Sequence, residues 1–249
     1  MKLDIVVVGA TSAVAQAAIR IWAERNTSLT LVGRNAEELA RIAADARVRG
    51  ASDVVVVVGD LTNAAFVTTT VAAFNTNGGA TAQALIAHGS LTDSAHADVD
   101  VNYLATELNT NFVSAALWAQ ALAERFSRAD CGGGTVAVIS SVAGDRGRGS
   151  NHAYGAAKAG LTAFCSGLRA RMHTRGVHIV TVKPGFIDSP MTAHIAKKGA
   201  LWASPETVAK GIVKAIDKKR DVVYLPSFWR VIMLIITHVP EKIFKRLKF

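Results

Sequence analysis

Residues 3–25, LDIVVVGATSAVAQAAIRIWAER, contain the pattern that decides the fold. Residues 3–8 are almost entirely apolar, as in a strand that is buried on both faces of a parallel sheet. Gly9 to Ser12 provide a turn, and residues 13–25 then place apolar side chains at helical spacing. Ser12 is suited to cap the start of this helix. The segment therefore predicts a strand, a tight turn and a helix.

The same alternation continues along the chain. Further strands are predicted at residues 28–33, 53–58, 82–87, 135–140, 177–182 and 221–225. Further helices are predicted at residues 36–49, 63–76, 97–127, 152–175, 190–197 and 205–218. Strands that alternate with helices are typical of a doubly wound parallel sheet. We predict an α/β, Rossmann-type fold with helices flanking the sheet, as one catalytic domain at 1–225 followed by an extension at 226–249.

The composition fits one large domain with a sizeable core, because half of the 249 residues are hydrophobic. Cys131 and Cys165 have neither paired nor metal-ligand spacing, which favours buried thiols in a reducing compartment and no metal site. The first apolar run is too short for a signal segment, and no run reaches the roughly 18 apolar residues that span a membrane. We therefore expect a cytoplasmic protein.

The formal net charge of +9 has two interpretations. It can serve solubility alone, or it can attract an anionic partner such as a phosphorylated cofactor, an acidic lipid surface or nucleic acid. The basic residues are dispersed, and no stripe of aromatic and basic residues outside the C-terminal extension resembles a stacking platform. This argues against nucleic acid.

The first turn is suited to bind a nucleotide pyrophosphate. Backbone N–H groups and the helix dipole favour an anion at a helix N-terminus. The glycine fingerprint is incomplete, because Ala13 and Ala15 stand where further glycines are usual, and each methyl hampers close approach without preventing it. The residues expected to contact a cofactor here are Gly9, Thr11, Ser12, Ala13 and Val14.

The end of the second strand indicates which cofactor is used. NAD-preferring folds usually place a carboxylate here for the ribose 2′-hydroxyl, but this strand ends in Gly33-Arg34-Asn35. An arginine at this position accommodates a 2′-phosphate, so the sequence favours NADP(H). Asp60, just after the third strand, can bind the adenine amino group or cap the next helix.

Tyr154 and Lys158 lie four residues apart in a helical segment, and therefore on one helix face. A nearby ammonium favours the phenolate and should lower the pKa of the tyrosine from about 10. Such a tyrosine can exchange a proton with an alcohol or carbonyl oxygen. Ser141, thirteen residues before Tyr154, can hydrogen-bond the same oxygen.

Taken in order, these residues resemble the short-chain dehydrogenase/reductase family over nearly the whole chain. The matching positions are Gly9-Ala10-Thr11-Ser12, Arg34, Asp60-Leu61, Asn111, Ser141, Tyr154-x-x-x-Lys158, Pro184-Gly185-Phe186-Ile187, Ser189 and Met191. The resemblance implies a homodimer or homotetramer that assembles through the helices at 97–127 and 152–175.

The resemblance also implies roles for the catalytic residues. Tyr154 would be the acid/base, Lys158 would lower its pKa and bind the nicotinamide ribose, and Ser141 would orient the substrate oxygen. Asn111 would hold a water molecule in a proton relay, although it can also be a polar residue at a helix bend. The implied cofactor contacts are Leu61, His88, Gly89, Pro184, Gly185, Ile187 and Ser189, besides the residues above.

The chain departs from the family pattern at Ala87-His88-Gly89, where Asn-Ala-Gly is usual. We expect His88 to be structural and close to the adenosine ribose, rather than a catalyst or a metal ligand.

A narrower resemblance, at residues 143–148 and 151–154 and in the C-terminal extension, is to the bacterial decaprenylphosphoryl 2-keto-erythro-pentose reductases. These enzymes reduce a keto sugar carried on a polyprenyl phosphate. Arg146 and Arg148 would suit such an anionic substrate. Two solvated loop arginines are the alternative.

The extension at 226–249, PSFWRVIMLIITHVPEKIFKRLKF, begins with an apolar run that is too short to span a membrane. After Pro240, apolar and basic residues alternate at helical spacing, as in a helix that lies at a membrane interface. The extension therefore either contacts the inner membrane surface, or covers a subunit interface or the substrate pocket.

The sequence predicts an NADP(H)-dependent oxidoreductase that reduces a ketone, in its most specific form a lipid-linked keto sugar. Reduction of 3-oxoacyl thioesters is the enzymatic alternative. A dinucleotide-sensing regulator without catalysis is the alternative from another class, although such proteins usually lose the tyrosine or the lysine.

Overall fold

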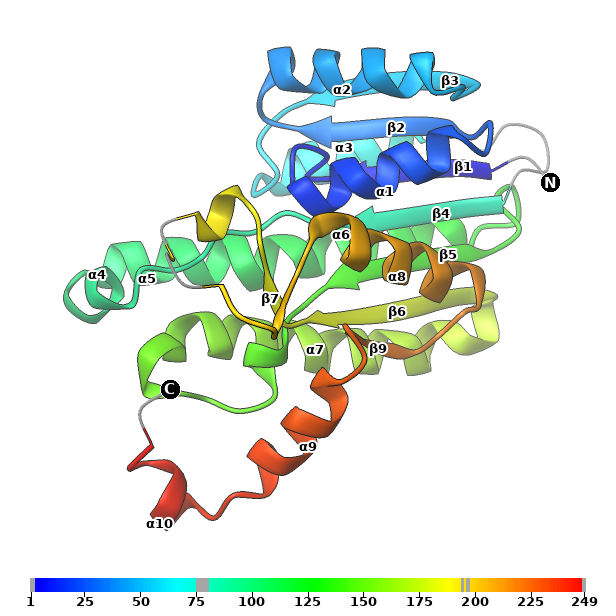
Figure 1. Ribbon diagram of the computed structural model, residues 1–249. Coiled ribbons are helices and arrows are strands. Elements are labelled where there is room, and N and C mark those ends of the chain that lie inside the picture. Colours follow the sequence, from blue (N-terminus) through cyan, green and yellow to red (C-terminus); the bar gives the residue numbers. More distant parts are fainter. Residues whose placement is uncertain (1–2, 75–80, 194, 196–197, 248–249) are drawn as a thin grey trace.

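The computed structural model describes residues 3–74, 81–193, 195 and 198–247. A seven-stranded parallel sheet forms its centre, in the order β3-β2-β1-β4-β5-β6-β9 (Figure 1). The strands are β1 Leu3–Val8, β2 Ser28–Gly33, β3 Asp53–Val58, β4 Thr81–Ile86, β5 Gly134–Ile139, β6 Val177–Pro184 and β9 Val222–Leu225. The strand order reverses between β1 and β4, which confirms the predicted doubly wound α/β sheet.

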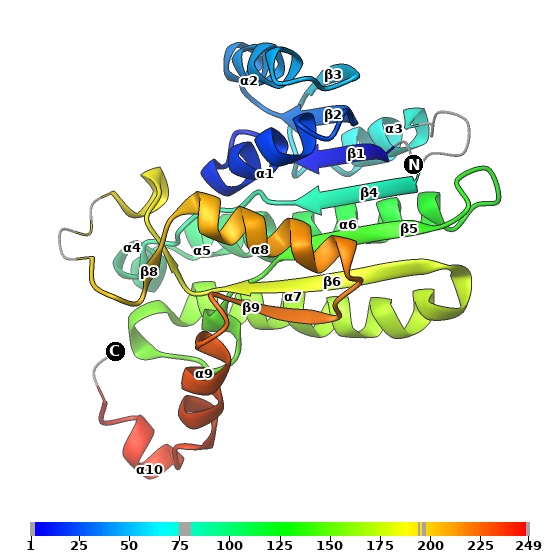
Figure 2. The same ribbon diagram turned by 45° about the vertical axis from the view of Figure 1, so that its right-hand side comes forward.

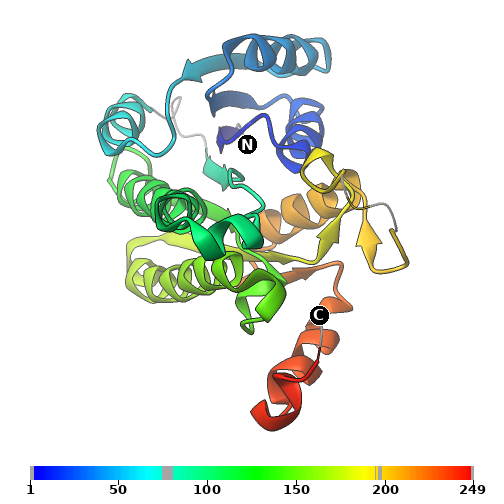
Figure 3. The same ribbon diagram turned by 90° about the vertical axis from the view of Figure 1, so that its left-hand side faces the viewer.

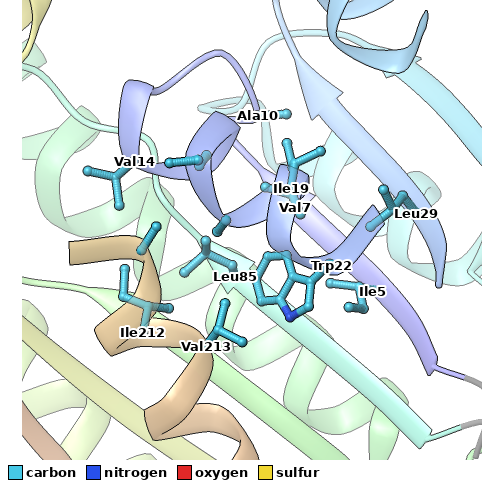
Figure 4. Close-up of a cluster of buried hydrophobic side chains, with 14 of the residues drawn as sticks. Ile5, Val7, Ala10, Val14, Ile19, Trp22, Leu29, Leu85, Ile212 and Val213 are labelled. Atoms are coloured by element: carbon cyan, nitrogen blue, oxygen red, sulfur yellow. The ribbon is translucent and has the colours of Figure 1, made fainter. Parts of the chain in front are cut away.

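Helices cover both faces of this sheet (Figure 3). The first face carries α1 Ala13–Ala23, α2 Ala36–Val48 and α8 Pro205–Asp217; the second carries α3 Ala64–Ala73, α6 Ser114–Phe126 and α7 His152–Met172. Side chains alternate along β1, so that Val7 enters the first core and Val8 the second. Figure 4 shows Trp22 of α1 packed in the first core near Leu85 and Val213.

The predicted long helix at 97–127 is wrong in its first part. The chain instead forms α4 Ser94–Val99, α5 Val101–Leu108, a π-helical turn at Asn109–Val113, and then α6. Asp100 starts α5 by accepting hydrogen bonds from the backbone N–H groups of Asn102 and Tyr103. This cap separates α4 from the continuous helical segment that begins at residue 101.

The helix predicted at 190–197 is, among its described residues, a 3₁₀ turn at Pro190–Thr192. Residues 194, 196 and 197 lie outside the described residues, as do 75 and 76 of the predicted third helix. The turn follows β7 Phe186–Ile187, which pairs with β8 Trp202–Ala203. Further 3₁₀ turns occur at Val142–Gly144, Gly149–Asn151 and His173–Arg175.

The C-terminal extension forms α9 Trp229–His238 and α10 Glu241–Phe244, which project from the end of β9 (Figure 2). Trp229 and Met233 are buried against Val142, in the loop that follows β5. Across the part of the chain that the structure describes, no helix is both long and apolar enough to cross a membrane.

Arg146 ties this extension to the loop after β5. Its guanidinium donates hydrogen bonds to the carbonyl oxygens of Ile236, Thr237 and Val239, at 3.0, 3.1 and 2.5 Å. It also pairs with Glu241 at 2.8 Å and lies 3.9 Å above the ring of Phe244. The expectation that Arg146 binds a substrate anion or is solvated is therefore wrong, because its donors are used by the last carbonyls of α9.

Replacing Arg146 by alanine should loosen the extension, because several charge-assisted hydrogen bonds are lost together. We expect the backbone amides at the end of α9 to exchange with solvent at least about tenfold faster, which corresponds to about 1.4 kcal/mol. Hydrogen exchange with mass spectrometry measures this, and Arg148→Ala is the control, since Arg148 makes no such contacts with α9. Equal exchange in the two variants would contradict the account.

Candidate active site

The loop after β5 presses directly on the backbone of α7. The Ser140 hydroxyl donates a hydrogen bond to the carbonyl oxygen of Lys158 at 3.0 Å. A Cβ atom on Gly144 would lie only 2.6 Å from the carbonyl carbon of Lys158. This contact fixes Ser141, at the end of the strand, relative to Tyr154 and Lys158 on the helix.

Ser141 and Tyr154 form a hydrogen-bonded pair. Ser141 is buried, and its hydroxyl also accepts a hydrogen bond from the N–H of Ala143 at 3.1 Å. Burial raises the pKa of Tyr154, and the hydrogen bond with Ser141 opposes this effect. The phenol is therefore protonated near neutral pH and able to donate a proton.

Lys158 is buried within α7, and burial lowers its pKa to about 8. Its ammonium donates a hydrogen bond to the carbonyl oxygen of Ile139 at 3.2 Å and lies 5.7 Å from the ring centroid of Tyr154. We predicted that this ammonium would lower the pKa of Tyr154, but burial is the larger effect and raises it.

Asn111 lies in the π-helical turn and is fully buried. Its Oδ1 accepts a hydrogen bond from the N–H of Ser90 at 3.0 Å. A Cβ atom on Gly89 would lie 2.9 Å from this Oδ1 and 3.6 Å from Nζ of Lys158. Gly89, Asn111 and Lys158 therefore meet at one point, and a π turn inside an α-helix is often associated with function.

His88 is held between the first turn and α6. Its Nε2 lies 2.8 Å from the hydroxyl of Ser114, which donates its own proton to the carbonyl oxygen of Leu61 at 2.7 Å. Nε2 must therefore carry the proton of the imidazole. Burial lowers the pKa of His88 to about 3, so the ring is neutral, which supports a structural role. Its place near an adenosine ribose stays a prediction.

Gly9 is required at the first turn. Its φ of +78° lies in the left-handed region, and a Cβ atom would lie 2.6 Å from the backbone nitrogen of His88. Ser12 occupies the N-cap position of α1, but its side chain makes no capping hydrogen bond. The first turn of α1, which includes Ala13 and Val14, contains no acidic residue, so nothing there repels an anion.

Arg34 is exposed directly after β2 and lies close enough to Asp60 to help lower the pKa of that carboxyl. The larger cause is that Asp60 accepts hydrogen bonds from the N–H and the hydroxyl of Thr62, both at 2.9 Å. The alternative that Asp60 caps the next helix is wrong, because Asn63 caps α3.

The remaining predicted residues follow β6 at the same edge of the sheet. Pro184 ends the strand, and Gly185 leaves no room for a Cβ atom beneath the indole of Trp229. Ile187 lies in β7, and the N–H of Ser189 donates a hydrogen bond to the hydroxyl of Thr192 at 3.2 Å. In open α/β sheets, ligands bind at this carboxyl edge.

Two polar groups near the site were not predicted from the sequence. Glu107 is buried beside Asn111 and four residues before it, a spacing that could have revealed it. Asp145 pairs with Lys183 at 2.5 Å and accepts a hydrogen bond from the hydroxyl of Tyr224 at 2.8 Å. Asp145 thus links the loop after β5 to β6 and β9. Because these three segments are far apart in the sequence, no local pattern could have predicted the contact.

The chain is similar to known proteins over most of its length. The short chain dehydrogenase family matches residues 4–200 of the chain. An uncharacterized oxidoreductase of Mycobacterium tuberculosis, Rv2073c, is 33% identical over 220 residues, which are 88% of this chain and 87% of that protein. The chain therefore belongs to the short-chain dehydrogenase/reductase family, whose members are oxidoreductases that use a nicotinamide dinucleotide.

Solved structures show the same fold. A short-chain dehydrogenase from Sphingobium yanoikuyae in complex with NADPH has a TM-score of 0.80 at 19% identity, covering 96% of this chain and 97% of that one. An actinorhodin polyketide ketoreductase with NADPH has a TM-score of 0.77 at 16% identity, covering 91% and 97%.

Replacing Gly144 by alanine should separate the loop from α7, because the new methyl group would overlap the backbone at Lys158. We expect a loss of about 1–3 kcal/mol in the free energy of unfolding, measured by chemical denaturation. Gly147→Ala is the matched control in the same loop, since a Cβ atom there meets nothing within 4 Å. An equally stable Gly144→Ala variant would refute the close contact.

Proposed function

We propose that this protein is an NADP(H)-dependent reductase that converts a ketone to a secondary alcohol. The observation that carries the proposal is that Ser141, Tyr154, Lys158 and Asn111 gather at the carboxyl edge of the sheet. The first turn, at Gly9, lies at the same edge, after β1.

The residues present fit a phosphorylated dinucleotide. Gly9, Thr11, Ser12, Ala13 and Val14 would hold the pyrophosphate at the start of α1, where no acidic side chain competes. Arg34 is exposed where the 2′-phosphate would bind.

The other cofactor contacts would come from the ends of the next strands. Asp60, Leu61, His88 and Gly89 would face the adenosine, and Pro184, Gly185, Ile187 and Ser189 the nicotinamide. The NADPH complex of the structure from Sphingobium yanoikuyae supports this choice of cofactor.

Proton transfer would be the task of the protein side chains. When bound, NADPH supplies the hydride. Tyr154 donates its phenolic proton to the carbonyl oxygen of the substrate, which Ser141 holds by a hydrogen bond. Lys158 favours the phenolate that this step leaves behind, and would bind the nicotinamide ribose. Asn111 would hold a water molecule that helps to return the proton.

Tyr154→Phe should reduce kcat for ketone reduction by about 10²–10⁴-fold, because the general acid is lost while the ring is kept. NADPH consumption measures this effect, and NADPH binding, followed by fluorescence, should stay unchanged. If the variant reduced every tested ketone as fast as the unaltered enzyme does, Tyr154 would not be the acid.

Arg34→Ala should raise KM for NADPH about 10–100-fold and leave KM for NADH nearly unchanged, because a charged contact to the 2′-phosphate is lost. Arg49→Ala, on the same face of the sheet, is the control, since Arg49 pairs with Asp45 and Glu24 instead. An equal change in KM for both cofactors would mean that Arg34 does not select NADP(H).

The substrate we favour is a carbonyl compound carried on a lipid, with a keto sugar on a polyprenyl phosphate as its most specific form. Exposed apolar side chains in the extension support it, because they offer a surface to a lipid. A 3-oxoacyl thioester is the second candidate, and the likeness to a polyketide ketoreductase favours it. Rates of NADPH oxidation with both substrates and with simple ketones discriminate between them.

We also propose that the protein forms homodimers or homotetramers. Apolar side chains on α5, the π-helical turn and α6 support this, because Val101, Val113 and Leu117 are exposed at 76%, 42% and 37%. Mass photometry or sedimentation would measure the state directly.

The extension would contact an anionic membrane surface from the cytoplasmic side. Val231, Leu234 and Ile235 of α9 are more than 60% exposed, although the opposite side of this helix is buried. Exposed basic residues accompany them in the same segment: Arg230, Lys242, Lys245 and Arg246. Apolar and cationic groups together are the pattern of a helix bound at a membrane interface.

Vesicles that contain phosphatidylglycerol should capture the protein in flotation assays, and vesicles of phosphatidylcholine alone should capture less. Replacing Leu234 and Ile235 together by serine should reduce capture at least about tenfold, since each apolar side chain contributes about 1.5–3 kcal/mol when buried. Val48→Ser, at an exposed apolar position on α2, is the control. Equal capture of both variants would exclude membrane contact through Leu234 and Ile235, and a dimer broken by the double replacement would indicate a subunit interface instead.

A further inference from the structure

Glu107 places a carboxylate inside the protein beside Asn111. Its side chain is only 8% exposed, and no lysine, arginine or histidine among the described residues forms an ion pair with it. A buried carboxylate is costly unless hydrogen bonds replace the lost water. Its Oε2 accepts three, from the hydroxyls of Ser90 and Thr92, both at 2.8 Å, and from Nδ2 of Asn111 at 3.3 Å.

These hydrogen bonds determine how the amide of Asn111 is oriented. Because Oε2 of Glu107 already accepts the hydrogen bonds of the two hydroxyls, the amide atom that faces it is the donor Nδ2. The second proton of Nδ2 goes to the hydroxyl of Ser90 at 3.0 Å, and that hydroxyl in turn donates to Glu107. Oδ1 then faces the N–H of Ser90. Each donor in this group has an acceptor, and the opposite orientation would leave two donors facing each other.

The orientation matters because Oδ1 lies near the ammonium group of Lys158. Oδ1 and Nζ of Lys158 both lie within 4 Å of the point where a Cβ atom on Gly89 would stand. An ammonium can only donate, so an acceptor oxygen can be linked to it directly or through one water molecule. A reversed amide would present Nδ2 to Lys158 and break that link.

We propose that Glu107 is a positioning residue of the reductase, which holds Asn111 with its oxygen directed toward Lys158. The proposal rests on the proposed function of Asn111 and Lys158. Glu107 acts only through Asn111, so it touches neither substrate nor cofactor, and it takes no part in any bond that forms or breaks.

A double-mutant cycle tests whether Glu107 acts through Asn111. Glu107→Gln preserves the shape but adds a donor, and we expect kcat to fall about 10–100-fold while KM for NADPH stays within about twofold. In the Asn111→Ala background, the same replacement should have no further effect on kcat. Glu124→Gln, on α6, is the control. Multiplicative losses in the double variant, or an unchanged kcat in Glu107→Gln, would overturn the proposal.

A second readout does not depend on activity. In the protein without substrate, the side-chain amide protons of Asn111 should exchange with solvent at least about tenfold faster in Glu107→Gln, as measured by NMR. Thr92→Val, which removes one donor to Glu107 and leaves Asn111 its own contacts, should cause a smaller increase and serves if Glu107→Gln does not fold. Unchanged exchange together with a lowered Tm would mean that Glu107 only stabilises the fold.

The failure of this proposal can be distinguished from failure of the proposed function. If Tyr154→Phe were fully active, the proposed role of Tyr154 in ketone reduction would be wrong. This conclusion would not depend on the exchange rate of the Asn111 amide protons. If Tyr154→Phe were inactive and Glu107→Gln behaved as the unaltered protein in both readouts, only the role of Glu107 would be wrong.

Discussion

The close contact between the loop after β5 and the backbone of α7 is the constraint on which the site depends. Gly144 has no room for a side chain against Lys158, and Ser140 is hydrogen-bonded to the carbonyl oxygen of the same residue. Since the loop begins at the end of a buried strand, the contact ties the helix to the sheet. This contact thereby holds Ser141, Tyr154 and Lys158 in one arrangement.

Several polar side chains are buried around this contact, where a hydrophobic core would contain only apolar ones. Lys158 is buried with the carbonyl oxygen of Ile139 as its acceptor, and burial brings its pKa to about 8. Burial also raises the pKa of Tyr154, which favours the protonated phenol that a reduction needs. Buried polar groups are tolerated when their hydrogen bonds are made, and they then hold a site rigidly. The amide of Asn111 follows the same rule through Ser90 and Glu107.

Much of the fold could be predicted because its signals are local. Each strand of the large sheet begins and ends within two residues of the expected place, since runs such as residues 53–58 are unmistakably strand-like. The helix boundaries within residues 97–127 could not be predicted. Asp100 starts a new helix, and the π-helical turn does not change the spacing of the apolar residues. The pKa direction of Tyr154 was wrong because burial is a property of the folded chain, not of helical spacing.

The contacts that could not be predicted from the sequence join segments that are far apart along the chain. Arg146 was expected to face a substrate or solvent, yet its partners are about ninety residues further along, at the end of α9. The extension is thus joined to the loop that carries Ser141, an arrangement that charge and periodicity alone do not reveal. The family could be predicted because its residues recur in a fixed order, whereas substrate choice depends on surfaces that form only on folding.

The most direct test of the proposed NADPH-dependent ketone reduction follows the hydride that is transferred. The enzyme would be supplied with NADPH that carries deuterium on the transferred position of the nicotinamide, together with a lipid-linked keto sugar, a 3-oxoacyl thioester or a simple ketone. We expect mass spectrometry to find one deuterium on the carbinol carbon of the alcohol product. Oxidation of NADPH without deuterium in any alcohol, or no oxidation with any of these ketones, would contradict the proposed reduction.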